Sequence, residues 1–144
     1  CARMVAARFA PNRTVFATLA DAAAKVGDYG RAKCWYARML QARIAPTRLE
    51  YNTVISAAAR SGDLRAARPW LSRMRAAAVT PDVDTYNALI YAAAKSEDAR
   101  AAELLHSEML GARLQPDVSS YNSLISAASR CGDFAGAEHW VDGM

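Results

Sequence analysis

The chain has 144 residues, a formal net charge of +4, 53% hydrophobic residues and 22% charged residues. Alanine inflates the hydrophobic fraction, since the mean hydropathy is only -0.08, and no apolar stretch reaches the about 18 residues that a membrane-spanning helix needs. Three cysteines without a CxxC pair argue against a disulfide framework and against a structural zinc site.

A period of 35 residues runs through the whole sequence. Five methionines follow it: Met4, Met39, Met74, Met109 and Met144. Four prolines follow it as well: Pro11, Pro46, Pro81 and Pro116. A strict period of this kind is typical of a solenoid, in which each unit buries its apolar face against its neighbours. We therefore expect the methionines to lie in a continuous core.

The period divides the chain without gaps. Residues 1–12 are expected to end a preceding unit, and complete units follow at 13–47, 48–82 and 83–117, with a partial unit at 118–144. Apolar stripes reach both ends of the sequence without a polar capping unit. This pattern favours a window of a longer array, or ends that pack on something else.

Each unit predicts two helices, of which unit 48–82 is the clearest example. Its first helix, of about 13 residues, carries an apolar stripe at i, i+3, i+4 and i+7, formed by Tyr51, Val54, Ile55 and Ala58. Gly62 is expected to end this helix and Asp63 to cap the next one. The same Gly-Asp pair recurs in the units before and after, except that Glu97-Asp98 replaces it in unit 83–117.

The second helix of the unit has its own apolar stripe. This stripe comprises Leu64, Ala67, Trp70, Leu71 and Met74. Trp35 and Trp140 hold the position of Trp70 in other units, and we expect all three indoles to pack between adjacent units rather than to stack on a ligand. Pro69 lies inside this helix, where a proline removes a hydrogen bond and is expected to produce a kink.

A Tyr-Asn pair opens three units and a Pro-Asp pair closes two. These pairs are Tyr51-Asn52, Tyr86-Asn87 and Tyr121-Asn122, with Pro81-Asp82 and Pro116-Asp117. Together with the period, they resemble the pentatricopeptide repeat of the class built only from 35-residue units. The resemblance covers residues 1–144 as a single array. It implies an all-α, right-handed α-solenoid that binds single-stranded RNA in a mitochondrion or chloroplast, for RNA processing, stability or translation.

In the family, the fifth and the last residue of each unit select one base. The resemblance therefore implies uracil for Asn52 with Asp82 and for Asn87 with Asp117, and a pyrimidine for Asn122, along a strand that runs 5′ to 3′ from the first unit to the fourth. It also places Ala17 with Thr47, a pair without a clear base preference, and Asn12 at the end of the unit before. The alternative is that these asparagines only decorate the first turn of a helix, where short polar side chains are common.

A basic residue recurs near the end of each first helix. These residues are Lys25, Arg60, Lys95 and Arg130. Stacked units would align them in a row suited to RNA phosphates. A solvated face that complements the negative end of the helix dipole would also place Lys or Arg there.

The second residue of each unit is usually an aliphatic that sandwiches the base in this family. Leu49 fits that role, whereas Thr14, Asp84 and Ser119 are polar. Charge is also uneven, since residues 1–82 carry a net +9 and residues 83–144 a net −5. These features favour a second hypothesis, that the array is a protein-binding scaffold or a structural subunit of a large organellar assembly.

Catalytic and cofactor chemistry is not indicated. His106 shares a helical face with Glu103, but a metal site needs a third ligand. The sequence has no pairing of a nucleophile with a base and no phosphate-cradling glycine loop. We therefore expect no enzyme, no cofactor and no metal.

Overall fold

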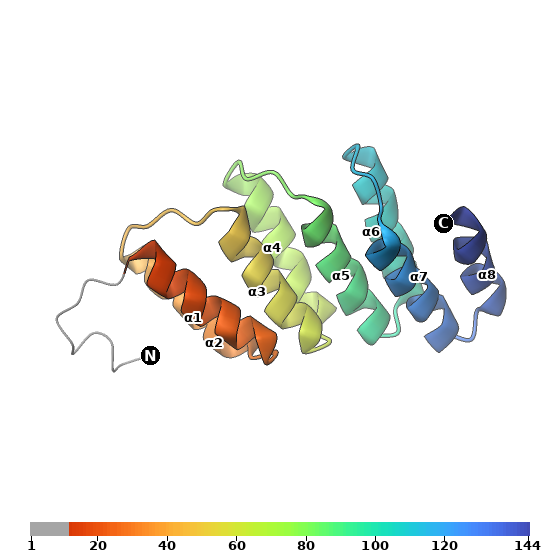
Figure 1. Cartoon of the computed structure of the whole chain (residues 1–144), viewed down its shortest axis with the longest axis horizontal. Helices are drawn as coiled ribbons and strands as arrows, with labels where there is room; N and C mark the ends of the chain where they lie inside the picture. The colour runs from red at the N-terminus through yellow and green to blue at the C-terminus, as the bar shows by residue number, and fades with distance from the viewer. Residues whose placement is uncertain (1–11) are drawn as a thin grey trace.

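The computed structural model describes residues 12–144, which fold into eight helices without any strand. In chain order the helices are α1 (Arg13–Lys25), α2 (Tyr29–Gln41), α3 (Arg48–Arg60), α4 (Leu64–Ala76), α5 (Val83–Lys95), α6 (Ala99–Gly111), α7 (Val118–Arg130) and α8 (Phe134–Gly143). Consecutive helices pair as antiparallel hairpins, which stack from one end of the molecule to the other (Figure 1). The expected solenoid of helical hairpins is thereby confirmed.

Every helix follows a polar N-cap residue. Seven of these caps are Asn or Asp, and each accepts a hydrogen bond from the backbone N–H three residues later. They are Asn12, Asp28, Asp63, Asp82, Asp98, Asp117 and Asp133. Such caps satisfy backbone donors that have no partner within the helix. The prediction that Asp63 caps the second helix of its unit is correct.

The turn inside each hairpin requires a left-handed residue. Gly27, Gly62 and Gly132 take it with φ of 73°, 76° and 75°, and Glu97 takes it in the third hairpin with φ of 57°. The backbone N–H of the next residue then bonds to a carbonyl of the helix, as in Asp63 N to Ala58 O at 3.2 Å. Glycine adopts this conformation without a steric cost, whereas the Cβ of Glu97 makes the same conformation unfavourable.

The helices form two layers of different spacing. Neighbouring members of the first layer, α1, α3, α5 and α7, approach one another closely along their backbones, whereas α2, α4, α6 and α8 do so only with helices of the first layer and reach each other through long side chains. Because its helices lie closer together, the first layer forms the inner side of the stack. Figure 1 looks onto this layer.

Small buried residues let the first helices approach closely. Ala57, Ala58, Ala92 and Ala93 are fully buried at the contacts of α3 and α5. Met39, Met74 and Met109 are buried as predicted, and Met4 lies outside the described residues. The expectation for Met144 is wrong, since it is 58% exposed. Within residues 12–144, α6 has a first-layer helix on each side, α5 and α7, whereas α7 is the one first-layer helix that contacts α8.

Two of the three tryptophans pack between hairpins, as predicted, whereas the ring of Trp35 lies against Phe16 of its own hairpin at 6.3 Å. Trp70 is buried, and its ring meets that of Tyr36 edge-on at 4.7 Å. Its Nε1 donates to the hydroxyl of Tyr29 at 2.9 Å, so α4 is tied to α2. At the other end, Trp140 meets His106 edge-on at 4.9 Å. Pro69 lies within α4, which continues as helix from Leu64 to Ala76.

Candidate nucleic-acid interface

A groove runs across the four first helices. It consists of two adjoining pockets of about 670 and 420 Å³, which share Tyr91, Ser119 and Ser123. Every helix of the first layer contributes to it, from Asp21 on α1 to Arg130 on α7. The groove therefore follows the direction in which the hairpins stack, as a binding site for an extended chain would.

Four of the predicted base readers form the two predicted pairs. Asn52 Nδ2 donates to Asp82 Oδ1 at 3.1 Å, and Asn87 Nδ2 donates to Asp117 Oδ1 at 3.0 Å. Both asparagines line the groove from the first turns of α3 and α5. Each aspartate is the last residue of its unit and also caps the first helix of the next hairpin, α5 or α7. One aspartate thus positions both a helix end and the amide of the preceding hairpin.

A hydroxyl completes each pair, and the sequence analysis did not identify it. Thr85 Oγ1 donates to Asn52 Oδ1 at 2.5 Å, and Ser120 Oγ donates to Asn87 Oδ1 at 2.5 Å. Thr85 and Ser120 are fully buried, three residues after Asp82 and Asp117. Their spacing is that of a capping box, a sequence signal for a helix cap but not for the contact with the asparagine.

These contacts determine which way each amide points. The carboxylate can only accept hydrogen bonds, so the NH₂ group must face it, and the amide oxygen faces the hydroxyl. One N–H and one oxygen lone pair of each asparagine remain for a ligand in the groove. The hairpins therefore present the same oriented donor and acceptor twice.

Electrostatics keep both aspartates ionised. Burial raises the pKa of the Asp82 carboxyl, but hydrogen bonds from Thr85 and Asn52 and the charge of Arg48 outweigh it, and the pKa lies below its usual value. The pKa of Asp117 is lowered in the same way, because hydrogen bonds from Ser120 and Asn87 outweigh the effect of burial. An ionised carboxylate accepts stronger hydrogen bonds than a neutral one.

The remaining predicted base readers are less complete. Asn122 lines the groove from α7, but the residue that would close its pair lies beyond residue 144. Ala17 is half-buried and has no polar side chain. Thr47 donates from its N–H and its hydroxyl to Glu50 Oε2, both at 2.6 Å, and Asn12 caps α1. The first hairpin thus has no oriented amide.

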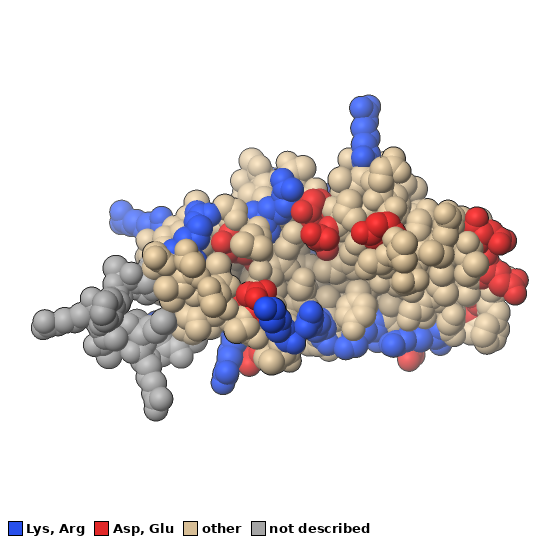
Figure 2. Space-filling model, viewed as in Figure 1, with Lys and Arg blue, Asp and Glu red and all other residues tan. Residues whose placement is uncertain are grey.

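The basic row lies along one side of the groove. Lys25, Arg60, Lys95 and Arg130 all line it, at the C-terminal ends of α1, α3, α5 and α7. Figure 2 shows Lys and Arg side chains along the lower edge of the molecule, where these helix ends lie. Arg60 Nη1 donates to Lys25 O and Lys95 Nζ donates to Arg60 O, both at 2.7 Å. Two members therefore complement the end of the preceding first helix, and the contact of this row with phosphates stays a prediction.

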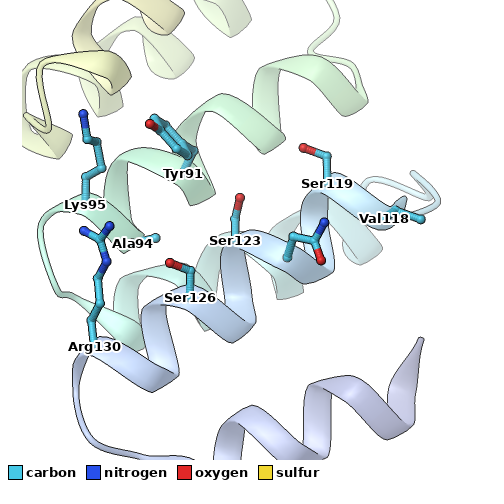
Figure 3. A pocket seen from close by; sticks show the side chains of 9 residues that line it. Tyr91, Ala94, Lys95, Val118, Ser119, Ser123, Ser126 and Arg130 are labelled. Atoms are coloured by element: carbon cyan, nitrogen blue, oxygen red, sulfur yellow. The ribbon is translucent and has the colours of Figure 1, made fainter.

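The residues at the second position of each unit differ in what they offer the groove. Leu49 lines the groove and is 63% exposed, so an aliphatic surface is present beside Asn52. Asp84 and Ser119 line it too and are polar, while Thr14 is exposed on α1. Tyr91, which the sequence analysis passed over, projects into the groove one turn after Asn87 (Figure 3).

Other kinds of site find no support in the described part of the chain. Among residues 12–144, no three His, Cys, Asp or Glu side chains gather as a metal site would require. No helix in this range has the length and apolar character to cross a membrane.

Comparisons with known families agree with this architecture. The family model described as a pentatricopeptide repeat domain matches residues 2–60, and that of the PPR repeat family matches 50–95 and 81–130. A further PPR repeat model matches residues 119–144. No curated protein matches the chain.

Solved structures match over almost the whole chain. The pentatricopeptide repeat protein PPR10 from maize matches with a TM-score of 0.80 at 22% identity, over 99% of this chain and 20% of that one. PPR10 in complex with an 18-nt psaJ RNA element matches with a TM-score of 0.86 at 27% identity, over 95% of this chain and 20% of that one. The PPR domain of Arabidopsis thaliana protein-only RNase P 1, in complex with tRNA, has a TM-score of 0.76 at 13% identity, over 99% of this chain and 74% of that one.

The chain thus spans about a fifth of the length of PPR10. Successive family models account for residues 2–144, and the hairpins have the arrangement of solved members. The chain belongs to the pentatricopeptide repeat family.

Proposed function

We propose that the chain binds single-stranded RNA along the groove of α1, α3, α5 and α7, with one base for each unit. The observation that carries this proposal is the oriented amide, which occurs twice in register as Asn52 with Asp82 and Asn87 with Asp117. The likeness to PPR10 in complex with an RNA element supports the same class of ligand. The repeat units 13–47, 48–82, 83–117 and 118–144 are the proposed binding modules.

The chemistry of each amide favours uracil. The amide oxygen accepts from the N3–H of uracil, and the free N–H donates to a neighbouring carbonyl of the base. If the base is held at the position that this pairing requires, cytosine at N3 and adenine at N1 would oppose the amide oxygen with a lone pair. An unpaired polar group in a closed contact costs about 1–3 kcal/mol, which is enough to give a preference. Asn122 contributes a pyrimidine preference in the fourth unit.

The basic row supplies the part of the affinity that does not depend on sequence. Lys25, Arg60, Lys95 and Arg130 neutralise phosphates along the edge of the groove, and this term weakens as salt displaces it. Leu49 contributes an apolar contact to the base beside Asn52. We propose that such binding serves RNA processing, stability or translation in a mitochondrion or chloroplast.

A base-exchange experiment tests this proposal. Wild-type protein and the double variant Asn87→Thr with Asp117→Asn are titrated into short labelled RNAs that differ only at the base expected beside residue 87. The panel includes guanine, which shares the N–H and carbonyl of uracil on a larger ring. We expect the preference to move from uracil toward adenine, while the base beside the unchanged Asn52 keeps its uracil preference as an internal control. An unmoved preference would exclude base reading by Asn87.

A second candidate function is that of a protein-binding scaffold or structural subunit of a large organellar assembly. The exposed carboxylate of Asp84 favours it, because Asp84 lines the same pocket as Asn52 and Asn87, where an RNA strand would approach. The net charge of −5 over residues 83–144 adds to this repulsion. Failure of every single-stranded RNA in the panel to bind would select this candidate.

A further inference from the structure

Tyr91 breaks the pattern of the groove. The equivalent residues 35 positions apart are Asp21, Ser56 and Ser126, which are small or charged. Tyr91 is the one aromatic residue among the described residues that line the groove. Its side chain is 42% exposed, although the adjacent residues Ala92–Ala94 are buried. Exposure of a large aromatic inside a groove is a feature that core packing does not explain.

The position of the ring relates it to the proposed base readers. Tyr91 lies four residues after Asn87 and four before Lys95, so all three share one face of α5. The same ring forms a wall of the pocket between α5 and α7, in which Asn122 lies on the α7 side. An amide, an aromatic ring and a cation therefore follow one another along α5.

The opposite wall of this pocket leaves room beside the ring. It is formed by small side chains of α7, including Ser119, Ser123 and Ser126, and it ends at Arg130 (Figure 3). Lys95 Nζ lies 5.6 Å from the centroid of the Tyr91 ring, within the range of a cation–π contact. Proteins stack the bases of single strands on aromatic rings in positively charged grooves, and Tyr91 is a partly exposed ring with Lys95 beside it and Arg130 in the same pocket.

This part of the groove also lacks the usual aliphatic contact for a base. Asp84 and Ser119 hold the second positions of the third and fourth units, and neither gives an apolar surface. We propose that Tyr91 is a stacking residue for the base bound between α5 and α7, next to Asn122. The inference rests on the proposed binding of single-stranded RNA. In the third and fourth units, Tyr91 would then provide the apolar contact with the base that Leu49 provides in the second unit.

Two substitutions and an altered RNA test the proposal. Tyr91→Ser introduces the residue that Ser56 and Ser126 already provide at this position, and Tyr91→Phe keeps the ring without its hydroxyl. Because stacking on an aromatic contributes about 1–3 kcal/mol per base, Tyr91→Ser is expected to weaken binding of a short oligouridine by about 5- to 150-fold. Tyr91→Phe should stay within about twofold of wild type, since it preserves the stacking face. Thermal unfolding followed by circular dichroism checks that both variants remain folded.

The altered RNA carries one abasic nucleotide at the position between α5 and α7. Wild-type protein should lose more affinity on this change of RNA than Tyr91→Ser does, because the variant has already lost the stacking contact and can lose only the contact of the base with Asn122. Additive losses would overturn stacking by Tyr91, as would a Tyr91→Phe variant as weak as Tyr91→Ser. If the stacking test fails but the base exchange at Asn87 and Asp117 succeeds, only the inference on Tyr91 is excluded. If the protein binds no RNA at all, the proposed function is excluded as well.

Discussion

Ser120 gives the sharpest test of how the hairpins hold their amides. Its hydroxyl donates to Asn87 Oδ1 at 2.5 Å, and the same oxygen accepts from the Asp117 backbone N–H at 3.1 Å. The side chain is fully buried, so water does not readily replace either bond. Ser120→Ala removes both contacts but leaves Asp117 to hold the NH₂ group of Asn87.

The expected loss follows from these two bonds. Each contributes about 0.5–1.5 kcal/mol, so Ser120→Ala should lower the free energy of unfolding by about 1–3 kcal/mol. Freeing the amide oxygen should reduce the uracil preference beside Asn87 by about two- to tenfold. The preference beside Asn52 should not change, because Thr85 still holds that amide.

Ser120→Thr is the matched control, since Thr85 fills the equivalent position one hairpin earlier and is equally buried. It should retain the uracil preference. Urea unfolding measures the stability, and competition between RNAs that differ at one base measures the preference. If Ser120→Ala discriminates as well as Ser120→Thr, orientation by the hydroxyl plays no part in base reading.

Two further predictions concern the scaffold. Glu97→Gly should raise the free energy of unfolding by about 1 kcal/mol, because a non-glycine residue at positive φ costs about 1–2 kcal/mol and the greater backbone entropy that glycine loses on folding offsets about half of that gain. Gly62→Ala, whose Cβ would meet only Lys95 Cβ at 3.6 Å, should lower the free energy of unfolding by a similar amount in the same urea experiment. A change of the opposite sign in either variant would contradict this account. His106 is buried between Tyr121 and Trp140 with no partner for Nε2, and burial lowers its pKa. The neutral form is thus favoured on folding, so stability is full above the ordinary pKa of about 6.5 and falls as the pH drops below it. His106→Leu should flatten the dependence of the unfolding midpoint between about pH 7.5 and pH 5. Equal pH profiles for wild type and His106→Leu would refute the assignment.

Most of the fold was accessible from the sequence because its determinants are local. Helix ends are specified by residues such as Asp63 and Gly62, which act within one turn of the chain. In a solenoid each hairpin contacts only its neighbours, so the 35-residue period extends one local solution along the molecule. The prediction that Met144 is buried was wrong, because burial at this position requires another helix packed beside α8 and does not follow from the period alone.

The candidate site was only partly accessible. Asn52 and Asn87 with their aspartates followed from the family pattern, which pairs the fifth residue of a unit with the last residue of the same unit. Thr85 and Ser120 were not identified, because a hydroxyl three residues after an aspartate indicates a cap within one helix and does not indicate that it reaches the preceding hairpin. Tyr91 was not predicted because it departs from the repeat. A comparison of equivalent positions brings out the residues that the units share and not a residue that occurs in one unit.

The basic row illustrates a similar limit. The sequence placed Arg60 and Lys95 at the ends of first helices and left both phosphate binding and helix-end complementarity open. The structure gives each a carbonyl partner in the preceding hairpin. Arginine has five N–H donors and lysine three, so these contacts leave donors for a phosphate.

A crystal structure of the chain with a short oligouridine tests the central claim most directly. The account predicts one base for each unit in the groove, with uracil edges in hydrogen-bond contact with Asn52 and Asn87 and the strand running 5′ to 3′ from α1 toward α7. Phosphates should lie near the basic row, and Tyr91 should stack on the base between α5 and α7. An RNA bound on the outer helices α2 and α4, or bases in the groove that leave both amides without contact, would contradict it.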